Sequence, residues 1–88
     1  MKVLSERRIQ YGEFHTFALL CQSLKREVWG CDGWNNLSTA QAEAVEMILH
    51  KISRIVNGDP DIVDSWLDIA GYATLGMNSI SGDNNERT

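Results

Sequence analysis

The sequence predicts an all-α protein with three main helices. Apolar residues recur at spacings of three and four through most of the chain. Helix-start and helix-stop residues divide this pattern into segments of about 13–29, 39–56 and 60–76. Because only a tight turn separates the last two segments, we expect them to form an antiparallel helical hairpin. With 88 residues, the chain forms one domain, which we expect to cover 1–76 and to precede a flexible polar tail over 77–88.

The first predicted helix, at about 13–29, follows Tyr11-Gly12 and rests on apolar residues that recur from Phe14 to Val28. Gly30 is a natural stop, and Lys25 falls on the expected solvent side. Residues 1–12 carry a few apolar side chains among charged ones and could form either a short helix or an arm.

The second predicted helix, at about 39–56, has a clear start. Ser38 followed by Gln41 has the spacing of a capping box. Gly58, or the residue before it, could take the left-handed conformation that ends the helix.

The third predicted helix, at about 60–76, begins after Asp59, a good capping residue, with Pro60 at its first position. Apolar residues lie on more than one of its sides, so we expect it to be buried or to sit in an interface. Its small residues would allow another helix to approach closely: Ala70, Gly71, Ala73 and Gly76.

Composition limits the cellular setting and the partners. The net charge of −4 argues against a general nucleic-acid binder. No apolar run approaches the roughly 20 residues that cross a bilayer, and the N-terminus has no signal-peptide hydrophobic region. We therefore expect a cytoplasmic protein with no membrane contact, whose Cys21 and Cys31 stay reduced and mostly structural. Large apolar groups exceed what one small core can hide, so we expect a homodimer or higher homo-oligomer that completes a helical bundle.

Acidic side chains of the second and third helices can face one another across the predicted hairpin. One side of the second helix carries Glu43, Glu46, His50 and Arg54. On the third helix, Asp64 and Asp68 lie four residues apart and share a side. Such a ring of carboxylates suits Mg²⁺, a hard cation that takes oxygen ligands and also binds substrate phosphates. Residue levels counted from the turn place Glu46, His50 and Asp68 at the centre.

These residues suggest distinct roles at a nucleotide site. We expect Mg²⁺ to be held by Glu43, Glu46, Asp64 and Asp68. Glu46 and His50 would position the attacking water, and Lys51 and Arg54 would contact phosphate. Trp34, in the loop before the second helix, could stack on a base or could simply cover the core.

A purely structural interpretation accounts for the same residues. Asp64 would pair with Arg54, Asp68 would pair with His50, and the two glutamates would be solvated. Exposed pairs of this kind stabilise a fold by only about 0–1 kcal/mol. Acids spaced three residues apart on a helix are common, so spacing alone does not identify a metal site.

Three segments of the chain carry a family resemblance. They read R-x-x-x-Y-G-x-F at 7–14, E-M-I-x-H-K-I-x-R-I-x-N-G-D-P-D at 46–61, and D-S-W-x-D-I-A-G-Y-A at 64–73. In these segments the chain resembles a group of small, uncharacterised phage and prophage proteins. More distantly, it is similar to the all-α nucleoside triphosphate pyrophosphohydrolases of the MazG-like superfamily.

The resemblance to the pyrophosphohydrolases implies a ligand set. In those enzymes an E-x-x-E pair and an E-x-x-D pair bind Mg²⁺, which carries over to Glu43, Glu46 and Asp68. Ser65 stands where the enzymes have the second-pair glutamate, and Asp64 lies beside it. The family also works as dimers or tetramers.

Two functions of different classes follow. The first is binding of Mg²⁺ and a (deoxy)nucleoside triphosphate, with hydrolysis to monophosphate and pyrophosphate if the site is active. The alternative is a non-enzymatic phage protein, acting in the host cytoplasm, that binds and inhibits a host or defence protein.

Overall fold

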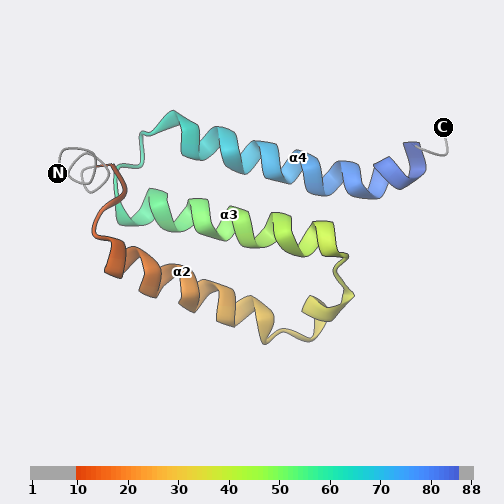
Figure 1. Cartoon of the computed structure of the whole chain (residues 1–88), viewed down its shortest axis with the longest axis horizontal. Helices are drawn as coiled ribbons and strands as arrows, with labels where there is room; N and C mark the ends of the chain where they lie inside the picture. Colours follow the sequence, from red (N-terminus) through yellow and green to blue (C-terminus); the bar gives the residue numbers. More distant parts are fainter. Residues whose placement is uncertain (1–9, 86–88) are drawn as a thin grey trace.

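The computed structural model describes residues 10–85, with side chains described as far as residue 80. Its elements are α2 (Phe14–Trp29), the 3₁₀ helix η1 (Asp32–Asn36), α3 (Thr39–Asn57) and α4 (Val63–Asn85) (Figure 1). The described range contains no strand, so the predicted all-α fold with three main helices is confirmed. Within this range, no helix combines the length and the apolar character needed to cross a membrane.

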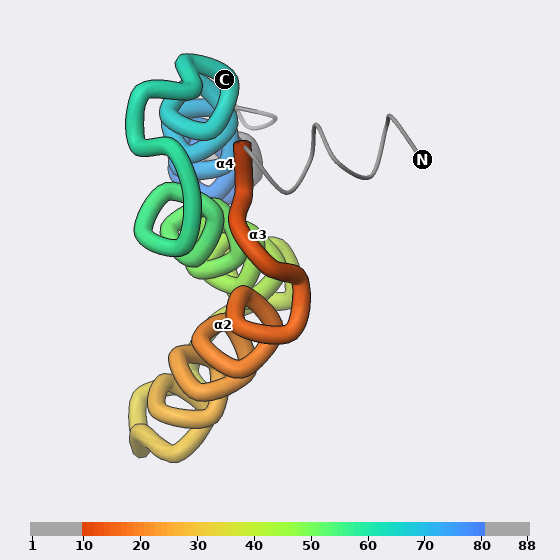
Figure 2. Tube along the Cα trace, turned by 90° about the vertical axis from the view of Figure 1, so that its left-hand side faces the viewer, coloured from red at the N-terminus to blue at the C-terminus, as the bar shows by residue number. Residues whose placement is uncertain are grey.

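The three long helices lie side by side in one layer, with α3 between α2 and α4 (Figures 1 and 2). Such a layer has two broad sides open to solvent, and its core is small. The buried described residues are Phe17, Cys21, Ala44, Ser53 and Ser65. The Ser53 hydroxyl is satisfied inside the layer, because it donates to the Leu49 carbonyl at 2.9 Å.

The start of α3 confirms the predicted capping box. The Ser38 hydroxyl accepts from the Gln41 backbone N–H at 3.1 Å, and the Gln41 side chain accepts from the Ser38 backbone N–H at 2.9 Å. Two N–H groups that the helix itself leaves unpaired are thereby satisfied. Only these local residues are needed, which explains why the sequence predicts this boundary well.

The turn between α3 and α4 differs from the prediction. The carboxylate of Asp59 accepts from the Asp61 N–H at 2.8 Å, so it stabilises a turn over Pro60 and Asp61, and α4 begins only at Val63. Gly58 has φ −135°, so the expected left-handed end of α3 is wrong at this residue. No residue other than glycine has a positive φ in the described range.

The segment that precedes α2 fixes this turn from outside. The Asp59 N–H donates to the Gln10 carbonyl at 2.7 Å, and the Asn57 side-chain amide donates to the Tyr11 carbonyl at 2.8 Å. Gly12 takes φ +81° here, and a Cβ on it would overlap the Asn57 carbonyl. A Cβ on Gly58 would likewise overlap the backbone of residues 10–11, so both glycines permit the contact. The rest of the predicted arm, residues 1–9, lies outside the described residues.

The helix α4 continues well past its predicted end at residue 76. It runs to Asn85, through nine residues that we assigned to a polar tail. Gly76, which we expected to allow close approach of another helix, lies inside α4 against α3, where an added Cβ would come within 3.3 Å of the Ala44 Cβ. The glycine therefore serves close approach of the helices, whereas Gly71 has open space around it.

Candidate functional site

The central helix α3 carries two stripes of different chemistry. One consists of Glu43, Met47, His50 and Arg54, and the other lies two positions further along at each step: Val45, Leu49, Ile52 and Val56. Because residues advance by about 100° around an α-helix, two positions correspond to about 200°. The two stripes therefore face the two opposite broad sides of the layer.

An ion pair shows which side of α4 joins the charged stripe. Lys51, which lies between His50 and Arg54, reaches across to α4, where its Nζ is 3.0 Å from Asp68 Oδ2. Asp64 lies one turn before Asp68 on the same side of α4. We call this side of the layer the charged face and define it by Glu43, His50, Lys51, Arg54, Asp64 and Asp68.

The opposite side of α4 is apolar along its length. Residues spaced alternately by three and four lie roughly half a turn from Asp68. Together with the apolar stripe of α3 they form what we call the apolar face: Val45, Leu49, Ile52, Val56, Val63, Trp66, Ala70, Ala73, Met77 and Ile80.

The Lys51–Asp68 pair is half open to solvent. The Lys51 side chain is 13% exposed, and the Asp68 side chain is 46% exposed. The pairing of Asp68 with His50 that the structural interpretation expected is therefore replaced by a pairing with the next residue along α3. The Asp68 carboxylate therefore remains accessible to solvent, with the ammonium of Lys51 beside it.

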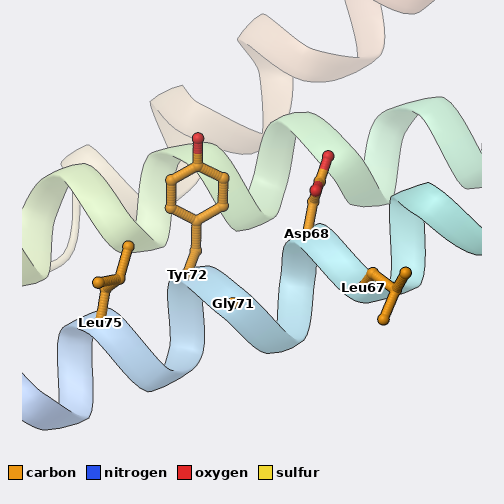
Figure 3. A pocket seen from close by; sticks show the side chains of 5 residues that line it. All are labelled: Leu67, Asp68, Gly71, Tyr72 and Leu75. Atoms are coloured by element: carbon orange, nitrogen blue, oxygen red, sulfur yellow. The ribbon is translucent and has the colours of Figure 1, made fainter.

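An open hollow of about 250 Å³ lies along α4 at this point (Figure 3). Asp68 and Tyr72 rise from α4 toward α3 and flank the gap that Gly71 leaves by having no side chain (Figure 3). The lining residues are Leu67, Asp68, Gly71, Tyr72 and Leu75. Ligand pockets commonly enclose about 300–1,000 Å³, so this hollow suits part of a ligand rather than a whole nucleotide.

The two residues predicted to position water, Glu46 and His50, turn toward α2 instead of α4. The Trp29 indole N–H donates to Glu46 Oε2 at 3.0 Å. The His50 ring meets the Phe17 ring edge-on, with ring centroids 5.0 Å apart. The structure therefore does not bring Glu46 and Asp68 together. Of the predicted centre, Glu46 and His50 contact α2, whereas Asp68 lies on α4 at the other edge of α3.

The electrostatic surroundings of His50 are cationic. Its pKa is lowered from 6.5, first because burial disfavours the charged imidazolium and then because Arg54, Lys51 and Lys25 lie nearby. Lys25 was expected to face solvent, but it contributes here from α2 and is half-buried. His50 is thus a neutral imidazole at pH 7, in a region that favours anions.

Arg54 is engaged by aromatic rings rather than by a carboxylate. Its guanidinium carbon lies 4.5 Å from the centroid of the Tyr11 ring and 5.9 Å from that of Phe17. The predicted Arg54–Asp64 pair is absent. Asp64 is exposed, and its carboxylate makes no ion pair or hydrogen bond within residues 10–85.

No three acidic, histidine or cysteine side chains of the described range come close enough together to hold a metal ion. Ser65, at the position where the resemblance places a glutamate, is 4% exposed and lies inside the layer. Glu43 is exposed on the charged face. Two carboxylates one turn apart, those of Asp64 and Asp68, are the pair that remains available on α4.

Trp34 lies in η1 and is half-buried. Its backbone accepts from the Leu37 N–H at 3.1 Å, while its indole makes no hydrogen bond or ring contact within the described part of the chain. Both roles considered for it, cover for the core and stacking on a base, stay predictions.

Sequence reasoning missed three residues of this region: Lys25, Trp29 and Tyr72. The sequence held a signal for the first two. Lys25 and Trp29 follow Cys21, which is buried, at spacings of four, so they lie on the same side of α2 as Cys21. No comparable signal marks Tyr72, whose place depends on the neighbouring Gly71 and on the rotation of α4.

Comparison with known proteins gives a family without an assigned role. The profile of a family described as a domain of unknown function, DUF6378, matches residues 2–80. The match covers most of the chain, so the chain belongs to this family. No curated protein and no solved structure matches it. The family match carries neither a phage origin nor a likeness to the MazG-like enzymes.

Proposed function

We propose that this member of the DUF6378 family binds Mg²⁺ together with a (deoxy)nucleoside triphosphate on its charged face. The observation that carries the proposal is the ion pair between Lys51 Nζ and Asp68 Oδ2 at 3.0 Å. It puts a carboxylate for a cation and an ammonium for a phosphate side by side at an open hollow.

The chemistry of Mg²⁺ fits a site with few protein ligands. Mg²⁺ keeps several waters and is usually bound through one or two carboxylates plus substrate phosphates. Asp64 and Asp68 supply that number, and the phosphates would complete the ligand set. Lys51, Arg54 and Lys25 supply positive charge for a triphosphate, as the lowered pKa of His50 indicates.

The proposal extends to hydrolysis to monophosphate and pyrophosphate. Neutral His50, on the charged face, would accept a proton from the attacking water. Glu46, which accepts a hydrogen bond from Trp29, would help to position the attacking water rather than bind the metal. Apolar surface at Tyr72 and Leu75 would receive the base beside the phosphates.

The test is a thermal-shift measurement with Mg²⁺ and a panel of NTPs and dNTPs, each component also being added alone. A ligand that binds only the native state raises the apparent unfolding temperature by mass action. For a chain of this size, each kcal/mol corresponds to roughly 4–8 °C. We expect a rise with Mg²⁺ plus at least one nucleotide, and loss of that rise in Asp68→Asn. Pyrophosphate release from the same nucleotide tests the hydrolytic extension.

Asp32→Asn is the matched control, because it makes the same change at an exposed acid of η1. It should keep the full shift. The proposal is wrong if no nucleotide with Mg²⁺ shifts wild-type unfolding. The assigned face is wrong if Asp32→Asn loses the shift and Asp68→Asn keeps it.

A second candidate is the non-enzymatic binding of another protein, with inhibition as its effect. The observation that favours it is the exposure of eleven large apolar side chains within the described residues. This candidate predicts a monomer that binds no nucleotide and forms a stoichiometric complex with its target. A dimer that binds Mg²⁺ and nucleotide would rule it out as the main role.

A further inference from the structure

We infer that the apolar face binds a second copy of this chain, so that α4 lies antiparallel to the α4 of the second copy and α3 lies antiparallel to its α3. Two hairpins stacked in this way form a four-helix arrangement with a twofold axis across the helices. The charged face would remain open on the outside of both copies.

The first argument is the exposure of the apolar face. Val56, Val63, Trp66, Met77 and Ile80 are each more than half exposed, although all are large apolar side chains. They form one continuous surface over two adjacent helices, not scattered single residues. A large contiguous apolar surface usually marks an interface.

The second argument is the small core of a single chain. The buried apolar residues of the described range are Phe17, Cys21 and Ala44. A short chain with so small a core is marginally stable. A standard interface covers about 800 Å² on each partner, so contact with a second copy would add substantially to the buried apolar surface.

The third argument is the spacing of the apolar residues on α4. Counted from Val63, they follow at alternate steps of three and four as far as Ile80. This is the a/d repeat by which two helices pack side by side along a common seam. The a positions are Val63, Ala70 and Met77, and the d positions are Trp66, Ala73 and Ile80.

The order of large and small residues is compatible with an antiparallel arrangement. When α4 is reversed about the midpoint of its apolar stripe, between Gly71 and Tyr72, Ala70 meets Ala73 of the second copy. Each large residue then meets one at the opposite end of the other helix: Val63 with Ile80, and Trp66 with Met77. The small alanines let the helices approach at the axis, and an isologous contact of this kind closes with two copies.

The apolar stripe of α3 is self-complementary in the same sense. Reversal about the midpoint between residues 50 and 51 brings Leu49 against Ile52 and Val45 against Val56. Two independent stripes therefore satisfy one twofold operation, provided their midpoints lie at the same height in the hairpin.

The contacts between α3 and α4 fix those heights. Lys51 lies beside Asp68, and Ala44 lies beside Gly76, so residue 48 of α3 is level with the midpoint of the apolar stripe of α4. The midpoint of the α3 stripe is between two and three residues away, which is about 4 Å at 1.5 Å per residue. One axis can therefore pass both midpoints within less than a helical turn.

The first test measures mass in solution by light scattering and sedimentation over the micromolar range. We expect the wild-type chain to have twice its monomer mass and Ala70→Glu to have the monomer mass, because the charge would be buried at the axis. Asn78→Glu is the matched control, since it lies on the same helix, exposed and away from the stripe. It should leave the dimer intact.

The second test fixes the register and does not depend on a disruptive variant. In a Cys21→Ala, Cys31→Ser background, a mixture of Val63→Cys and Ile80→Cys chains should form a mixed disulfide on oxidation. Val63→Cys alone should not cross-link, because the two copies of residue 63 would lie about 25 Å apart along the helices. A disulfide needs Cα atoms within about 7 Å.

Three outcomes would overturn the inference. A wild-type chain that is monomeric throughout the range removes the second copy as the partner, whether or not another protein then binds this face. Cross-linking of Val63→Cys with itself indicates a parallel pair. Dimer loss in Asn78→Glu but not in Ala70→Glu places the contact on the other side of α4. None of these outcomes depends on nucleotide binding, which the opposite face would carry.

Discussion

His50 is the single residue whose charge state most directly reports the packing of α2 on α3. Burial between the helices and the cations Arg54, Lys51 and Lys25 all lower its pKa. Since its folded-state pKa lies below 6.5, the unfolded chain takes up the proton first as the pH falls. The stability that depends on neutral His50 is therefore present above about pH 6.5 and is lost as the pH falls below it toward the folded-state pKa.

We expect the free energy of unfolding of the wild-type chain to decrease between pH 7.5 and pH 5.5. The decrease should be smaller in His50→Gln, which has no titrating group at this position. Urea titrations at one fixed protein concentration measure it, and the slopes with pH are compared because the variant also loses its contact with Phe17. An equal slope in both proteins would contradict the assignment to His50.

Single residues also show what could be predicted from the sequence. The Ser38–Gln41 capping box was predictable because both partners lie within one helical turn. The contact of Trp29 with Glu46 joins residues 17 apart and depends on how α2 is rotated against α3. Sequence spacing put Glu46 on one side of the second helix with Glu43 and His50, but it could not tell which neighbouring helix Glu46 would meet.

At the scale of elements, the end of α4 shows how composition can mislead. The polar residues after residue 76, rich in Gly, Asn and Ser, suggested a mobile tail. In the structure these residues continue the helix to Asn85, and Gly76 is a contact point with Ala44. The start of α4 was also misjudged, since the Asp59 carboxylate caps a turn that precedes the helix.

The two glycines of α4 give a matched pair for testing this account. Gly71→Ala has open space and should stabilise the protein by about 0.5–1 kcal/mol through helix propensity. Gly76→Ala gains the same propensity but brings a methyl group to 3.3 Å from Ala44, so it should be less stable than Gly71→Ala. Chemical denaturation measures both. Greater stabilisation by Gly76→Ala would contradict the close approach of α3 and α4.

At the scale of the whole molecule, the layer of three helices separates two kinds of surface. The sequence predicted the helices, the hairpin and an excess of apolar residues. The structure confirms the helices and shows part of that excess on the apolar face. The predicted ring of four carboxylates does not form within the described residues, because α3 directs Glu46 to one neighbour and Lys51 to the other. Which side of a central helix meets which neighbour follows from packing, and spacing within one helix does not contain that information.

Native mass spectrometry with Mg²⁺ and single NTPs or dNTPs tests most directly the claim that the two faces have separate roles. It counts chains and bound nucleotides in the same spectrum. With at least one of these nucleotides, we predict a species of two wild-type chains that carries two nucleotide molecules. For Asp68→Asn we predict two chains without nucleotide. A single chain would contradict the role of the apolar face, and two chains that bind none of the NTPs or dNTPs would contradict the role of the charged face.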